Sequence, residues 1–108
     1  VPALVVSGIP CDRFVFEGFL PHKKGRQKRI IALAEEERTV VLYESPHRIL
    51  KLLNEIETHC GSDRWVACSR EISKLHEQTV RGPASELIAH FTEHEPRGEF
   101  VVVMAGKP

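Results

Sequence analysis

The densest group of side chains able to do chemistry lies in one stretch of nine residues. Two bases, two acids, two hydroxyls and a histidine occur together in Ser69-Arg70-Glu71-Ile72-Ser73-Lys74-Leu75-His76-Glu77. Carboxylates, amines and imidazoles move protons in general acid–base catalysis, and a cluster of them can also position a substrate. The candidates for these roles are Glu71, Lys74, His76 and Glu77. A second interpretation stays open, because the same side chains could form an exposed ladder of ion pairs without a chemical role.

A second group stands where a predicted strand gives way to a helix. It reads Tyr43-Glu44-Ser45-Pro46-His47-Arg48 and follows a β-branched apolar run. Ser45 is expected as the N-cap of the helix and Pro46 as its first residue. Ligands of open α/β sheets bind beyond the carboxyl ends of the strands, which favours a binding site at this junction. The alternative is an ordinary strand-to-helix turn, in which Glu44 pairs with Arg48.

Cationic side chains crowd the start of another predicted helix. They are Lys23, Lys24, Arg26, Lys28 and Arg29, and the glutamates at 35 to 37 close the same helix. The helix dipole favours the opposite arrangement by roughly 0.3–1 kcal/mol per group, so the sequence gives up some helix stability here. A cationic helix start with free N–H groups suits phosphate, which makes the segment a candidate contact for a nucleic-acid backbone. The alternative is a charged, solvated loop and helix start that serves solubility alone.

Alternating elements are predicted to position these groups. Apolar runs rich in β-branched and aromatic residues predict strands at Phe14–Phe19, Thr39–Tyr43, Trp65–Ser69 and Phe100–Met104. Helical spacing of apolar residues predicts helices at Gly25–Glu37, from Ser45 to near Gly61, and at Pro83–Thr92. The stretch from Arg70 to Gly82 is polar and carries no predicted element, and the apolar run Val1–Val6 is expected to continue from a larger protein. The alternation predicts an α/β fold, with a mostly parallel or mixed sheet of about four or five strands flanked by helices.

Composition limits the class of protein. The chain has 108 residues, with 15 Lys and Arg against 15 Asp and Glu, so it fits one domain and its net charge indicates no particular partner. No apolar run approaches the ~20 residues that span a bilayer, and no signal peptide is recognisable, so we expect a soluble cytoplasmic protein without membrane contact. Cys11, Cys60 and Cys68 form no CxxC pair, which predicts reduced thiols and no disulfide.

Common metal and nucleotide motifs are missing from the sequence. His90 and His94 are separated by Phe-Thr-Glu, which is not an HExxH arrangement, so no metal site is predicted. The sequence holds no P-loop, GxSxG or GxGxxG, and a self-contained nucleotide site is therefore not expected.

Four segments, in this order, carry a resemblance to a known family: SGIPCDRFVFEGFLPHKKGRQKR, ERTVVLYESPHRILKLL, SREISKLHEQTVRG and RGEFVVVMAG. Together they resemble the C-terminal half of the small-subunit ribosomal RNA methyltransferases of the tetrapyrrole methylase superfamily. The resemblance covers essentially the whole chain. It implies cytoplasmic bacterial homodimers with two α/β domains, which hold S-adenosylmethionine between the domains. Residues 1–108 would then form the C-terminal domain, and the Gly-rich N-terminal cofactor domain is not part of this chain.

The resemblance also implies a reaction and its site residues. The reaction is methylation of the ribose 2′-oxygen of a cytidine in 16S ribosomal RNA of the small ribosomal subunit. The implied contacts to S-adenosylmethionine are Ser7, Gly8, Ile9, Pro10, Tyr43, Glu44 and Ser69, and the segment from Lys23 to Arg29 would hold RNA phosphates. Cys11 stands where the family has threonine, so a hydroxyl contact there is not carried over.

Other functions fit the same residues. One is a methyltransferase of the superfamily that acts on a tetrapyrrole or another small substrate, although the basic segment argues against it. Another is an RNA-binding or interaction module without catalysis. If the chain is half of an enzyme, it is expected to be inactive alone and to bind the cofactor weakly or not at all, because half of a cleft encloses too little of the ligand.

Overall fold

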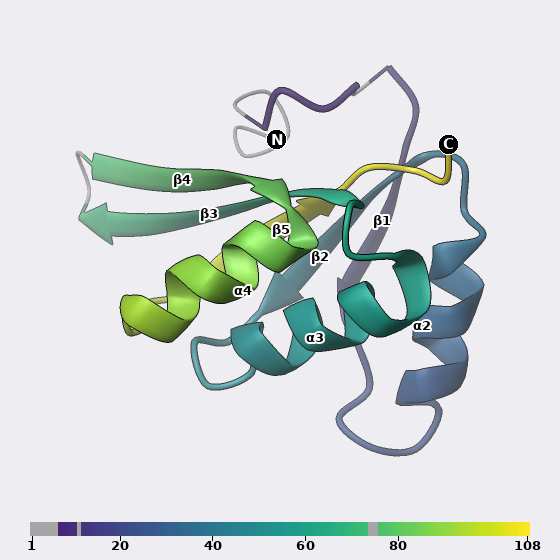
Figure 1. Cartoon of the computed structure of the whole chain (residues 1–108), viewed down its shortest axis with the longest axis horizontal. Helices are drawn as coiled ribbons and strands as arrows, with labels where there is room; N and C mark the ends of the chain where they lie inside the picture. Colours follow the sequence, from purple (N-terminus) through teal and green to yellow (C-terminus); the bar gives the residue numbers. More distant parts are fainter. Residues whose placement is uncertain (1–6, 11, 74–75) are drawn as a thin grey trace.

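The computed structural model describes residues 7–10, 12–73 and 76–108, with the backbone alone for 71–73, 76 and 77. The strands are β1 (Phe14–Phe19), β2 (Thr39–Glu44), β3 (Trp65–Ser73), β4 (His76–Pro83) and β5 (Phe100–Met104). The helices are α2 (Arg26–Ala34), α3 (Ile49–Cys60) and α4 (Ala84–Glu93). In Figure 1 these helices lie in one layer in front of a single sheet.

The five strands form one mixed sheet in the order β1-β2-β5-β3-β4. β1 runs parallel to β2, whereas β2 with β5, β5 with β3, and β3 with β4 are antiparallel pairs. The last strand in sequence therefore lies at the centre of the sheet, where both of its edges are paired. This position accounts for the uninterrupted apolar run of β5, and the predicted α/β fold with a mixed sheet is confirmed.

Alternate side chains of the strands face the helices and form the main core. Val40, Leu42 and Val102 of the sheet pack in one buried cluster with Leu33 of α2 and Leu53 of α3. Fully burying a side chain of this size contributes about 1.5–3 kcal/mol before conformational entropy is subtracted. The apolar spacing in the sequence thus selects the helix faces that turn toward the sheet.

The opposite face of the sheet, here called the open face, is covered by none of the described helices. Val41, Ala67 and Val103 lie at its centre and pack with Ile9 from the N-terminal segment. Because neighbouring residues of a strand point to opposite faces, residues two positions away from these share the open face. The sequence predicted the sheet but not that one of its faces would lack a helix layer.

The predicted start of the second helix, at Ser45, is wrong. α3 begins at Ile49 rather than at Ser45, and the N-cap position is Arg48, which has no side-chain cap bond. The residues before it form a turn closed by the Arg48 N–H, which donates to the Ser45 carbonyl at 3.1 Å. The Ser45 N–H in turn donates to Oε1 of Glu44 at 2.9 Å. The carboxylate of Glu44 therefore stabilises the turn, and Pro46 lies in the turn instead of the helix.

The polar stretch from Arg70 to Gly82 is a β-hairpin, which the sequence did not predict. β3 continues to Ser73, and β4 returns beside it as an edge strand, paired only with β3. The Arg70 guanidinium bridges the two strands by donating to Oε1 of Gln78 at 2.7 and 3.1 Å. Polar and charged residues are what an edge strand needs to avoid pairing with other chains. In Figure 1 this hairpin extends past the helix layer.

Replacing Gly106 with alanine should destabilise the fold. A Cβ at this position would lie 1.8 Å from the backbone oxygen of Glu37, so the segment after β5 would have to shift. We expect a loss of about 1–3 kcal/mol in the free energy of unfolding, measured by urea denaturation. Lys107→Ala is the control, since it removes only an exposed ion pair with Glu35. Equal urea midpoints for the two variants would contradict this packing.

Candidate functional site

One row of residues crosses the open face from strand to strand. Tyr43 of β2 pairs with Phe19 of β1 on one side and with Val101 of β5 on the other. Val101 pairs in turn with Ser69 of β3, and Ser69 with Thr79 of β4. The hydroxyls of Ser69 and Thr79 are hydrogen-bonded at 2.8 Å. The row thus places aromatic rings at one end and hydroxyl groups at the other.

The N-terminal segment lies over the adjacent row. Ile9 contacts the apolar centre of the open face, and its N–H donates to Oγ of the buried Ser7 at 3.1 Å. The Pro10 carbonyl accepts a hydrogen bond from the Thr39 hydroxyl at the start of β2. Gly8 adopts a φ of 73°, and a Cβ there would lie 3.1 Å from Nη1 of Arg81. The segment therefore contacts the sheet through Ile9 and is joined to the start of β2 through Pro10.

The structure brings most of the predicted cofactor residues onto this one face. Ile9 lies over its centre with Ser7, Gly8 and Pro10 next to it in the chain, and Tyr43 and Ser69 belong to the adjacent row. Glu44 does not join them, because it follows Tyr43 in β2 and its side chain faces the helices, where it is only 4% exposed. The Glu44 side chain therefore lies on the opposite face from Tyr43 and Ser69, and its role as a cofactor contact stays a prediction.

Glu44 is instead part of a buried ionic network. Arg26, at the first position of α2, is 4% exposed and donates twice to Glu55 of α3, from Nε at 3.0 Å and from Nη2 at 2.8 Å. Its Nη2 also lies 3.4 Å from Oε2 of Glu44, and its Nη1 donates to the Pro21 carbonyl at 3.1 Å. The hydrogen bonds to Glu55 raise the pKa of Arg26 above its ordinary value.

This network corrects the predicted role of Arg26. A guanidinium enclosed by two carboxylates cannot also reach an RNA phosphate, so Arg26 holds α2, α3 and β2 together rather than contacting a ligand. Lys23, Lys24 and Lys28 are exposed. Arg29 is exposed as well, but it forms an ion pair with Glu17 of β1. The cationic surface of the basic segment therefore consists of the three lysines with a partly neutralised arginine.

The predicted catalytic cluster falls at the far end of the β-hairpin. In its backbone register Glu71 pairs with Glu77, and Ser73 with His76. Lys74 lies outside the described residues. The hairpin places Glu71 two residues beyond Ser69, or roughly 6.7 Å along the strand. The roles of these residues stay predictions, but the cluster adjoins the row that crosses the open face.

Sequence reasoning missed an aromatic group at the β1 end of the row. Phe16, Phe19 and Tyr43 are exposed, and the ring of Tyr43 contacts both phenylalanines. A cavity of about 300 Å³ opens beside it, lined by Phe19, Tyr43, Glu99, Phe100 and Val101. The spacing of the three phenylalanines in FVFEGF was the available signal in the sequence. Several large apolar side chains exposed together on one face of an edge strand indicate a functional surface.

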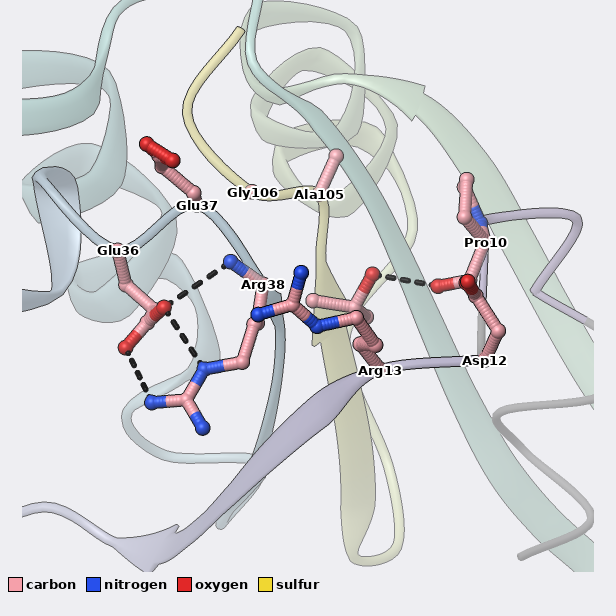
Figure 2. Close-up of a pocket in the computed structure, with 9 residues that line it drawn as sticks. Pro10, Asp12, Arg13, Glu36, Glu37, Arg38, Ala105 and Gly106 are labelled. Atoms are coloured by element: carbon pink, nitrogen blue, oxygen red, sulfur yellow. Dashed lines mark hydrogen bonds and ion pairs between the residues drawn. The ribbon is translucent and has the colours of Figure 1, made fainter.

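A second pocket, of about 450 Å³, lies at the opposite end of the strands (Figure 2). Its rim holds Arg13 and Arg38 together with Asp12, Glu36 and Glu37. Figure 2 shows the Arg38 side chain turned toward Glu36, and the Arg38 guanidinium and backbone N–H donate hydrogen bonds to the Glu36 carboxylate. These hydrogen bonds lower the pKa of Glu36 to about 2. The pocket sits at the amino ends of β1 and β2, whereas ligands of open α/β sheets bind at the carboxyl ends. We assign it no function.

Neither a metal centre nor a membrane span can be built from the residues that the structure describes. Within 7–10, 12–73 and 76–108, no group of three or more His, Cys, Asp and Glu side chains could hold a metal ion. No helix in these ranges is long and apolar enough to cross a membrane. Cys60 and Cys68 are free thiols, and burial raises the pKa of both.

Comparison with known proteins gives the family. No family model matches the sequence. The chain is, however, 50% identical to ribosomal RNA small subunit methyltransferase I of Synechocystis sp., over 98% of its own length. It is 46% identical to the methyltransferase I of Thermotoga maritima, over 97% of the chain. It is 42% identical to the methyltransferase I of Escherichia coli O157:H7, over 98% of the chain. The chain is a homologue of ribosomal RNA small subunit methyltransferase I. The resemblance carried by the four sequence segments is thereby confirmed.

The match covers only part of these relatives. The chain spans 38% of the Synechocystis methyltransferase I and 47% of the Thermotoga protein. Among solved structures, the methyltransferase CobJ is similar with a TM-score of 0.68 at 16% identity, over 96% of this chain and 46% of that one. Cobalt precorrin-4 methyltransferase CbiF is similar with a TM-score of 0.67 at 15% sequence identity, and the match covers 95% of this chain and 46% of CbiF. At these identities the likeness shows the fold alone: the chain has the fold of about half of each of these two proteins.

Proposed function

We propose that the chain is the C-terminal domain of an S-adenosylmethionine-dependent enzyme that methylates the ribose 2′-oxygen of a cytidine in 16S ribosomal RNA. The observation that supports this most is the 50% identity to the Synechocystis methyltransferase I over 98% of the chain. The whole enzyme would act in the cytoplasm as a homodimer on the small ribosomal subunit. The chain alone would supply one wall of the cofactor cleft and be inactive.

The open face has the groups that such a cofactor needs. The residues that would hold it are Ser7 to Pro10, Tyr43 and Ser69. Gly8, Pro10 and Tyr43 are exposed, whereas Ser7, Ile9 and Ser69 are buried in this chain. When bound, S-adenosylmethionine supplies a methyl group on a positively charged sulfur. A flat surface encloses only one side of a ligand of this size, so a second domain would have to cover the other side.

The residues of the chain would act by positioning and by proton transfer. Exact placement of the ribose hydroxyl can account for ~7–11 kcal/mol of the barrier. A general base that removes the hydroxyl proton adds roughly 10²–10⁴-fold in rate. The hairpin end supplies three candidates for this base, Glu71, His76 and Glu77, next to the row that ends in Ser69 and Thr79. The fourth candidate, Lys74, lies outside the described residues. We propose that one of them is the base and another positions the ribose.

A tetrapyrrole substrate is the second candidate, and the fold favours it, since CobJ and CbiF share the architecture. Tritiated methyl transfer by the full-length enzyme separates the two. We expect label in 16S ribosomal RNA of small subunits, at a nucleotide whose 3′-linkage resists alkaline hydrolysis because its 2′-oxygen is methylated. Label that appears only in an added precorrin, or in an RNA base, would contradict the proposal.

The basic segment should contribute to RNA affinity through its lysines. Each phosphate contact changes the slope of log affinity against log salt by roughly 0.7–0.9. Replacing Lys23, Lys24 and Lys28 together with glutamine should therefore lower the slope for the full-length enzyme by about two units. Arg26 is left intact because it is buried. Lys51→Gln, an exposed change on α3, serves as the control and should leave the slope as it is. A slope that the triple change does not alter would remove this segment from the RNA site.

A further inference from the structure

Two members of the aromatic group at the β1 end of the open face, Phe16 and Phe19, have no role in the function proposed above, and they flank Tyr43, which is proposed there as a cofactor contact. Phe19 is 61% exposed, Phe16 54% and Tyr43 37%, although the core could hold such side chains. The centroid of the Tyr43 ring lies 5.2 Å from that of Phe16 and 5.4 Å from that of Phe19, with the rings crossing at 77° and 63°. These edge-to-face contacts fix Tyr43 between the two phenylalanines. The result is a preformed aromatic surface in contact with water.

The cavity beside this surface has the chemistry of a nucleobase site. Two of its lining residues, Phe19 and Tyr43, offer rings on which a planar base can stack, and Val101 forms its apolar floor. Glu99 supplies a carboxylate, which among the described residues makes no hydrogen bond or ion pair. A carboxylate accepts a hydrogen bond from the exocyclic amino group of cytosine and repels bases that present only acceptors there.

The cations of the basic segment follow β1, and with it Phe19, closely in the chain. Lys23 follows Phe19 by four residues, and a chain spans at most ~3.6 Å per residue, so their Cα atoms lie within about 14 Å of each other. Lys24 comes next, and both lysines are exposed. Stacking rings beside a cationic strip are what proteins use to bind single-stranded nucleic acid, because every base has a π-face and every nucleotide a phosphate.

We infer that the Phe19–Tyr43 cavity binds a nucleobase of single-stranded RNA, preferably one with an exocyclic amino group such as cytosine. The inference rests on the proposed function and specifies its RNA site. The base would stack on Phe19 and Tyr43 and donate to Glu99, while the adjoining phosphates meet Lys23 and Lys24. In the row of the open face, Tyr43 then lies between Phe19, where RNA would bind, and Ser69, which is proposed to contact the cofactor.

Titration of the 108-residue chain with fluorescently labelled single-stranded RNA tests this inference. The probes are a short oligocytidine, an oligouridine of equal length, and an oligocytidine with abasic central positions. We expect Phe19→Leu to weaken oligocytidine binding by about tenfold and Phe19→Tyr to restore most of it. Abasic RNA should bind the Leu variant and the wild type equally. Phe14→Leu is the matched control, because Phe14 is exposed on the same strand and face without lining the cavity.

The arms of the experiment separate the possible failures. Equal affinity of Phe19→Leu and the wild type for oligocytidine would overturn the proposed stacking site. Equal affinity of each protein for oligocytidine and for its abasic form would overturn it as well. Neither outcome would affect the proposed methyl transfer. Wild-type preference for oligocytidine over oligouridine should fall in Glu99→Gln, and an unchanged preference would overturn the role of Glu99. A Phe19→Leu variant that alters only self-association, seen by sedimentation, would show that the aromatic surface meets a second copy and not RNA.

Discussion

Arg26→Ala should lower the free energy of unfolding by about 3–5 kcal/mol, because it leaves the buried carboxylate of Glu44 and the half-buried one of Glu55 without their partner. The Arg26 guanidinium is hydrogen-bonded to Glu55 and to the Pro21 carbonyl and lies beside Glu44, and its side chain is only 4% exposed. Urea denaturation of the chain measures the change.

Lys24→Ala is the matched control for that measurement. Lys24 belongs to the same basic segment but is exposed, so its removal should change the free energy of unfolding by less than about 0.5 kcal/mol. If Arg26→Ala and Lys24→Ala were equally stable, Arg26 would not be held by the network, and its return to the group of RNA contacts would be justified.

The second large effect is expected on turnover. In the full-length enzyme, Lys74→Ala and Glu77→Ala should each reduce the rate of methyl transfer, and the change that removes the general base should reduce it by about 10²–10⁴-fold. Thermal stability should hardly change, since exposed ion pairs contribute only ~0–1 kcal/mol to folding. Single-turnover methyl transfer and thermal unfolding have to be measured on the same preparations.

Glu93→Gln is a suitable control for the turnover measurement. Glu93 is an exposed carboxylate at the end of α4, which packs against the face of the sheet opposite the proposed site. It should transfer methyl groups at the wild-type rate. If Lys74→Ala and Glu77→Ala also matched the wild type, the cluster at the hairpin end would be an ion-pair ladder with no chemical role.

The sequence predicted what depends on local patterns. Apolar runs located four of the strands within a residue or two at the strand starts, and the alternation of elements indicated a mixed α/β sheet. Tyr43 and Ser69 were predicted to serve one site, and the register confirms only that both strands present them on the same row of the open face. That they share a face could not be foreseen, because it depends on β5, the last strand, inserting between β2 and β3.

What failed depends on partners distant in sequence. Arg26 was assigned to the RNA surface because five cations stand together, yet its burial is decided by Glu44 and Glu55, 18 and 29 residues away. The β4 strand was missed since its stability comes from pairing with β3 rather than from its own apolar residues. The helix start at Ser45 was wrong because the Glu44 carboxylate, placed by the same network, stabilises a turn there.

We propose the open face of this sheet as one wall of the cofactor cleft. Hydrogen–deuterium exchange of the full-length enzyme, with and without S-adenosylhomocysteine, is the decisive test. We expect slower exchange in the segment 7–10 and in the peptides that contain Tyr43 and Ser69, with no change in α3 and α4. Protection confined to the helices, or to the pocket around Arg13 and Arg38, would show that the cofactor binds elsewhere.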